Sequence, residues 1–186
     1  MDAEYIVYMN EEFKKHPEIL QNKDSHYLGL NWQKSAAFFK KEAVAGRDIS
    51  PAADALKNVF YESQQVPVMD EVSAALIYQS INQSDFSDLD GLIQNTAYPD
   101  FIFSVFLTVA ENKDHLEPAV PFLLSWSAKR KAPALPILKE IISKSSDREN
   151  LISESADFFL KKKKNLLPAF LKSLAGSNIS INSEIH

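Results

Sequence analysis

Pro118-Ala119-Val120-Pro121-Phe122-Leu123-Leu124 begins an apolar segment that ends in Lys129-Arg130-Lys131. Proline is tolerated in the first turn of a helix, because the N–H that it lacks would have had no partner there. Lysine and arginine are favourable in the last turn, where unpaired carbonyl groups leave a partial negative charge. The stretch therefore predicts a short helix from about residue 118 to about residue 130.

The same pattern recurs towards the C-terminus. Pro133-Ala134-Leu135-Pro136-Ile137-Leu138 is a second copy, and Leu166-Leu167-Pro168-Ala169-Phe170-Leu171 keeps the central proline with its apolar neighbours. Stacked helix pairs of the HEAT type look similar over residues 99–176, but the chain lacks a constant period. We therefore predict an all-α fold, a single irregular bundle of about nine or ten short helices. HEAT-like antiparallel pairs in the C-terminal half are the alternative.

Apolar spacing predicts helices in the first part of the chain as well. They cover residues 2–15, 32–45, 51–63, 70–81, 86–95 and 99–111. Ser50 and Asp70 are the expected N-caps of the third and fourth of these helices. Ser146 and Glu149 form a candidate capping box for a later helix that ends near residue 163. The segment 99–111 is apolar all round, which predicts a helix at the centre of the protein.

Length and composition favour one globular domain with a loosely attached end. The chain has 186 residues, of which 45% are hydrophobic and 24% charged, both close to ordinary globular usage. We expect a single helical domain over residues 1–176. Residues 177–186 form a polar tail in which Ile179 and Ile181 alternate with polar residues, and we expect this tail to be flexible or to dock onto a partner.

Charge and cysteine content narrow the location and the partners. The formal net charge is −5 and there are no cysteines, so disulfides and thiolate metal sites are excluded. A general polyanion binder is normally basic, which makes nucleic acid an unlikely partner. The N-terminus has no basic leader, and the longest apolar run, residues 101–110, is too short for a membrane span. We therefore expect a cytoplasmic protein.

The sequence contains no complete catalytic or metal-binding motif. Asp85, Asp88, Asp90 and Gly91 resemble part of a calcium-binding loop, but the first and last ligand positions would be Phe86 and Ala97, which supply no carboxylate. No histidine pair has zinc spacing, and no glycine-rich loop or nucleophile motif is present. We expect no metal, no cofactor and no catalytic residue, although carboxylates from different helices could still converge in a site.

Two groups of residues are candidates for contacts with another molecule. Tyrosine suits wet protein interfaces because one end of its ring is apolar and the other forms hydrogen bonds. The tyrosines that lie off the centre of their apolar stripes are Tyr5, Tyr8 and Tyr61. The basic run Lys161, Lys162, Lys163 and Lys164 could contact phosphates, but its place at a predicted helix end favours stabilisation of the helix dipole.

An aromatic-rich helical body without site chemistry favours a protein-binding role. The sequence-based hypothesis is a non-enzymatic protein–protein interaction module, such as a small acidic cytosolic adaptor, a secretion chaperone or a toxin-immunity protein. One alternative is a small enzyme or ligand binder with a site between helices. The other is a phosphate or anionic-surface binder that uses Lys161–Lys164. The identity of the partner and the oligomeric state stay open.

Overall fold

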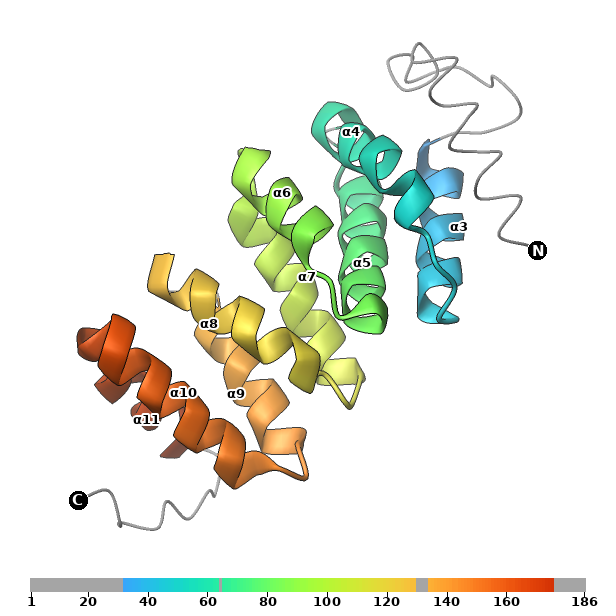
Figure 1. Ribbon diagram of the computed structural model, residues 1–186. Coiled ribbons are helices and arrows are strands. Elements are labelled where there is room, and N and C mark those ends of the chain that lie inside the picture. Colours follow the sequence, from blue (N-terminus) through green and yellow to red (C-terminus); the bar gives the residue numbers. More distant parts are fainter. Residues whose placement is uncertain (1–31, 64, 130–133, 176–186) are drawn as a thin grey trace. The chain divides into compact units, whose positions relative to one another are not determined.

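The described part of the protein is entirely helical (Figure 1). The structure is a computed structural model that describes residues 32–63, 65–129 and 134–175. These ranges hold nine α-helices and no strand, which confirms the predicted all-α class. None of these helices is long and apolar enough to cross a membrane. The predicted helix at 2–15, Tyr5, Tyr8 and the tail at 177–186 lie outside the described residues.

The chain divides into two compact units, Met1–Val105 and Phe106–His186. The division falls within a helix, α7 (Pro99–Asn112). The single domain expected over residues 1–176 stays a prediction.

The first unit is built around α5. Its helices are α3 (Trp32–Val44), α4 (Ala53–Ser63), α5 (Val66–Gln83) and α6 (Ser87–Asn95), with a 3-10 turn, Ser50–Ala52, ahead of α4. Helix α5 packs against α3, α4 and α6, and all of its residues from 72 to 77 are buried. Six consecutive buried residues leave no face of these turns for solvent, which is why α5 carries so few charged side chains.

The start of α5 corrects the sequence-based prediction. Asp70 was the expected N-cap, but α5 begins at Val66, with Gln65 as N-cap and Pro67 in the first turn. Proline at this position breaks no intrahelical hydrogen bond. Asp70 therefore lies within the helix. Ser50 likewise belongs to the 3-10 turn that precedes α4 and is not its N-cap.

Helix α7 is not apolar all round, contrary to the prediction. Its buried residues include Ile102, Phe103 and Phe106. Four polar residues at intervals of three or four, Asp100, Ser104, Thr108 and Glu111, are exposed. This spacing forms a solvent-facing stripe, so α7 has a polar edge, and the helix buried on all sides is α5.

The second unit contains consecutive antiparallel neighbours. Its helices are α8 (Val120–Lys129), α9 (Ala134–Lys144), α10 (Arg148–Lys162) and α11 (Leu167–Ala175). Each helix contacts the next one along the chain, and α8 also contacts α10 while α9 also contacts α11 (Figure 1). The HEAT-like arrangement of this half stays a prediction. The 3-10 turns Glu117–Ala119 and Lys164–Leu166 precede α8 and α11.

The helix ends are closed in different ways. Gly46 has φ +78° after α3, and the N–H groups of Gly46 and Arg47 donate to the carbonyls of Ala43 and Glu42, respectively, a common way for glycine to end a helix. The capping box of Ser146 and Glu149 is wrong. Helix α10 begins at Arg148, and its N-cap Asp147 makes no side-chain capping hydrogen bond.

Candidate functional site

A groove on the first unit runs between α4 and α6. It consists of two adjoining cavities, of about 400 Å³ and about 250 Å³. The larger cavity is lined by Asp54, Lys57, Asn58, Tyr61, Gly91 and Asn95. The smaller one is lined by Phe60, Tyr61, Asn95, Thr96, Ala97 and Tyr98. Tyr61 and Asn95 line both cavities, so the two form one continuous surface, here named the α4–α6 groove.

Lys57 is the cation of the larger cavity, and two carboxylates neutralise it. Its Nζ atom lies 2.8 Å from Asp54 Oδ1 on α4 and 2.8 Å from Asp88 Oδ1 on α6. Burial of the ammonium group lowers its pKa, but the hydrogen bonds and charges of Asp54 and Asp88 outweigh burial and raise the pKa of Lys57 above its ordinary value. Lys57 is therefore fully charged and engaged within the protein.

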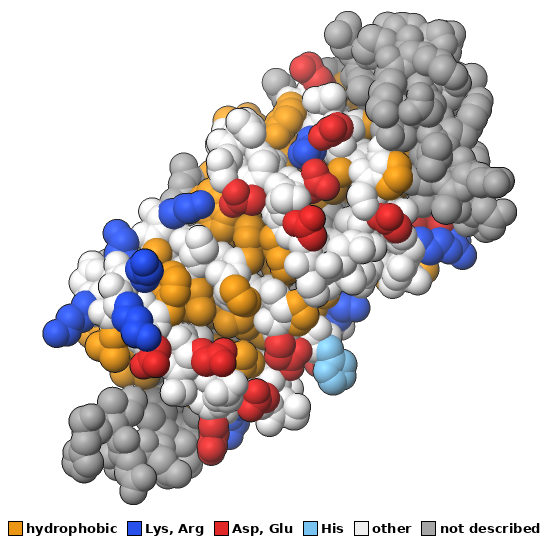
Figure 2. Space-filling view, viewed as in Figure 1, with side chains coloured by type: hydrophobic (Ala, Val, Ile, Leu, Met, Phe, Trp, Pro, Cys, Tyr) orange, Lys and Arg blue, Asp and Glu red, His pale blue; other side chains and the backbone are white. Residues whose placement is uncertain are grey.

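The two helices that border the groove are acidic overall. Helices α4 and α6 carry four carboxylates, Asp54, Glu62, Asp88 and Asp90, and one lysine, Lys57, which leaves a net charge of −3. Figure 2 shows acidic side chains grouped around a single basic one over α4 and α6. The Asp54 side chain is 90% exposed, so its carboxylate lies at an open rim.

Aromatic rings form the other end of the groove. The ring of Tyr61 meets Phe60 edge to face at a centroid distance of 6.2 Å, and Phe60 in turn contacts Phe101 at 6.5 Å. Burial raises the pKa of Tyr61 above its ordinary value, the charge of Lys57 opposes this rise, and the charge of Asp54 adds to it. Tyr98 is 53% exposed. Tyr61 is thus held in place by the core, while Tyr98 offers its ring to solvent.

Gly91 lies in the interior of α6 without a local reason to be glycine. Its φ is not positive, and a Cβ built at this position would meet no atom within 4 Å. Glycine inside a helix costs about 0.5–1 kcal/mol relative to alanine. Since Gly91 lines the larger cavity, the absent side chain leaves that cavity deeper than alanine would.

The acidic residues that resemble a calcium loop have other roles. Asp85 Oδ1 accepts a hydrogen bond from the N–H of Ser87, and this bond, together with the Ser87 side chain, lowers the pKa of Asp85. Asp88 pairs with Lys57, and Asp90 accepts a hydrogen bond from Gln94. Within the described ranges, no group of three histidine or carboxylate side chains is placed to hold a metal ion.

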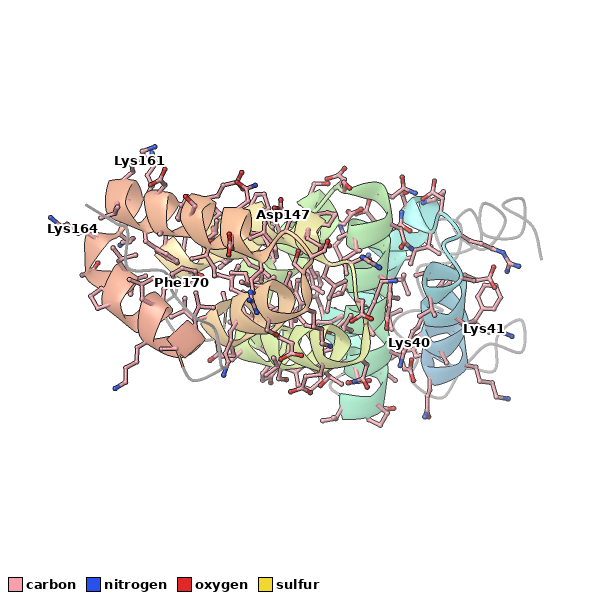
Figure 3. All side chains as sticks on the ribbon, turned by 90° about the horizontal axis from the view of Figure 1, so that it is seen from below. Lys40, Lys41, Asp147, Lys161, Lys164 and Phe170 are labelled. Carbon is pink, nitrogen blue, oxygen red and sulfur yellow. The ribbon has the colours of Figure 1, made fainter. Side chains whose placement is uncertain are left out.

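The other predicted site residues lie in the second unit. Lys161 and Lys162 are in the last turn of α10, Lys163 is its C-cap, and Lys164 begins the following 3-10 turn. All four side chains are exposed. Figure 3 shows Lys161 and Lys164 pointing away from the helices, whereas Phe170 of α11 points towards α10, where its ring contacts Phe159. The structure therefore places Tyr61 in one unit and the lysine run in the other.

Sequence reasoning missed most of the α4–α6 groove. Of its lining residues, only Tyr61 was singled out as a partner contact. Lys57 and Asp88 are thirty-one positions apart, and no periodic pattern links residues at that separation. Gly91 offered the one usable signal, because a glycine within a predicted helix indicates a packing or functional reason.

Comparisons with known proteins add no assignment. No protein-family model, no curated protein and no solved structure matches this chain.

Proposed function

We propose that this protein is a non-enzymatic protein–protein interaction module that holds its partner in the α4–α6 groove. The observation that supports this most is the joined pair of cavities with Tyr61 and Tyr98 at one end and polar groups at the other. Tyrosine is enriched among residues that dominate binding energy, and a polar rim around an apolar centre is typical of protein interfaces. A cytoplasmic adaptor, secretion chaperone or immunity protein would use such a surface.

The groove suits recognition better than chemistry. Its lining offers amides from Asn58 and Asn95, the Asp54 carboxylate and two tyrosine rings, groups that can all form hydrogen bonds with a peptide. Its one strongly engaged cation, Lys57, has a raised pKa, whereas a lysine that acts as a nucleophile or base needs a lowered one. These features favour binding over the alternative of an enzyme.

Capture from a lysate of the source organism tests the proposal when it is paired with a groove variant. The bait is the purified full chain, and retained proteins are identified and quantified by mass spectrometry. We expect one stoichiometric protein on the wild type and a loss of about tenfold or more with Tyr98→Ser, as for an interface hot spot. Leu160→Ser is the matched control, because Leu160 is also an exposed apolar residue, at 42%, but lies on α10.

Two results would contradict the proposal. One is a wild-type bait that retains no stoichiometric protein. The other is a Tyr98→Ser bait that melts at the wild-type temperature and retains the partner as well as Leu160→Ser does. Melting curves for all three proteins separate a lost contact from a lost fold.

The exposed lysine run supports a second candidate function, the binding of phosphate or anionic surfaces. No described residue forms an ion pair with Lys161, Lys162, Lys163 or Lys164, so their charge is available to an anion. Retention on heparin at rising salt measures this function. Lys161→Gln with Lys164→Gln should shorten retention if the run binds anions. The control pair Lys34→Gln with Lys41→Gln removes the same charge from α3.

A further inference from the structure

We infer that the α4–α6 groove takes a basic, extended peptide segment of a partner protein. A lysine or arginine of that segment enters the larger cavity beside Asp54 and Gly91, and a neighbouring apolar side chain enters the smaller cavity beside Tyr61 and Tyr98. This inference rests on the proposed function, since it names the kind of partner that the same groove binds.

The charge of the partner follows from the charge around the groove. Lys57, the one cation on α4 and α6, is shared between Asp54 and Asp88, so these three groups together keep one excess negative charge. The two helices have an excess of carboxylates, and the Asp54 side chain is 90% exposed. A positively charged side chain would therefore be attracted to this surface, and an acidic one would be repelled.

The shape of the groove indicates an extended ligand with two different side chains. The two cavities join at Tyr61 and Asn95, so a ligand that fills both has to continue across these residues. The larger cavity is bounded by the Asp54 carboxylate, the Lys57 ammonium group that pairs with it, and the amides of Asn58 and Asn95, whereas the smaller one has the rings of Phe60, Tyr61 and Tyr98. An arginine side chain suits the larger cavity, because its guanidinium group can bond to the Asp54 carboxylate and also stack on the ring of Tyr61.

Gly91 provides an observation independent of charge. Neither its backbone angle nor a neighbouring atom requires glycine, yet alanine would stabilise the helix. A Cβ at this position would project into space that the protein itself leaves empty. A ligand side chain that occupies this space would explain why a glycine is tolerated inside α6.

Two fluorescein-labelled peptides test the inference on the full chain by fluorescence anisotropy. One alternates arginine and leucine, and the other has glutamate in place of each arginine. We expect the arginine peptide to bind the wild type at about 50 mM salt and to bind more weakly at about 500 mM salt. The glutamate peptide should not bind.

Substitutions then locate the binding surface. Asp54→Asn should weaken binding of the arginine peptide about two- to fivefold, the range typical of an exposed ion pair. Glu149→Gln removes an exposed carboxylate from α10 and should leave binding unchanged. Gly91→Ala should weaken binding while it raises the melting temperature, a combination that a structural role for Gly91 would not produce.

Each contrary result overturns the inference in a recognisable way. Equal weakening by Asp54→Asn and Glu149→Gln would show attraction to the net charge of the chain and not to the groove. Binding of the glutamate peptide, or of neither peptide, would reject a basic partner. In these cases the proposed function would still hold if a protein captured from the lysate by the wild type is lost with Tyr98→Ser. If the wild type forms a dimer and the double variant Lys161→Gln/Lys164→Gln does not, the occupant of the groove is a second copy of this chain.

Discussion

The side chain of Gln79 accepts a hydrogen bond from the backbone N–H of Ile49, over a distance of 3.0 Å between nitrogen and Oε1. Gln79 lies in α5, and Ile49 lies in the connection between α3 and α4. The Gln79 amide nitrogen also donates to Asp48 Oδ1 at 2.8 Å and to Ser50 Oγ at 3.1 Å. One buried amide thus holds three successive residues of a connection against the central helix of the first unit.

Gln79→Leu should destabilise the protein by about 2 kcal/mol. The Gln79 side chain is only 4% exposed, so leucine fits the apolar surroundings but leaves the Ile49 N–H buried without its acceptor, a loss of about 1–3 kcal/mol. Gln83→Leu is the matched control because Gln83 is exposed on the same helix. Urea unfolding measures both variants, and equal stabilities would show that the amide does not anchor the connection.

Asp48 should make folding stability depend on pH in the acid range. Hydrogen bonds from the side chain and the backbone of Ser50 lower the pKa of Asp48 below its ordinary value of 3.8, burial opposes this, and the Gln79 amide adds to the lowering. A lowered folded pKa means that the charged form stabilises the folded state. This stabilisation is present above the ordinary value and is lost as pH falls through the folded pKa.

The comparison that checks this is wild type against Asp48→Asn, measured by urea unfolding at about pH 6 and about pH 3. Asparagine keeps an oxygen that can accept from Ser50 but has no charge to lose. We expect the wild type to be the more stable protein at the higher pH and the difference to shrink at the lower one. A difference that stays constant with pH would show that the Asp48 charge does not act on folding.

Ser155→Ala should stabilise the protein by about 1 kcal/mol. The Ser155 hydroxyl on α10 is fully buried and has no hydrogen-bond partner among the described residues. Removing an unsatisfied buried polar atom recovers its desolvation cost. Ser127→Ala is the control, since Ser127 is equally buried but donates to the Leu123 carbonyl at 2.8 Å. Thermal unfolding should show a rise only for Ser155→Ala.

The sequence predicted which segments are helical more reliably than where they begin or what they contact. Apolar spacing placed α3, α6 and α7 well, because that spacing is a local property of the chain. The predicted start of α5, at Asp70, is too late, because Pro67 is compatible with the first turn of a helix. The groove stayed hidden because it depends on the packing of α4 against α6, which joins residues far apart in sequence.

The correction of α7 leads to the last prediction. The prediction of a wholly apolar helix failed at the stripe of Asp100 and Ser104, but Phe106 on another face has no exposed surface. Phe106→Asp should therefore cost several kcal/mol, from the lost aromatic packing and from an unpaired buried carboxylate. Ser104→Asp places the same charge on the exposed edge and should change the free energy of unfolding by less than about 0.5 kcal/mol.

A second variant separates the charge from the lost ring. Phe106→Asn removes the same aromatic contacts as Phe106→Asp but carries no ionisable group. Burial raises the pKa of a carboxyl group, because it disfavours the charged form. The aspartate variant should therefore be less stable than the asparagine variant at about pH 7, and this gap should narrow at about pH 4. A Phe106→Asp variant that unfolds like Ser104→Asp would instead place residue 106 at the surface.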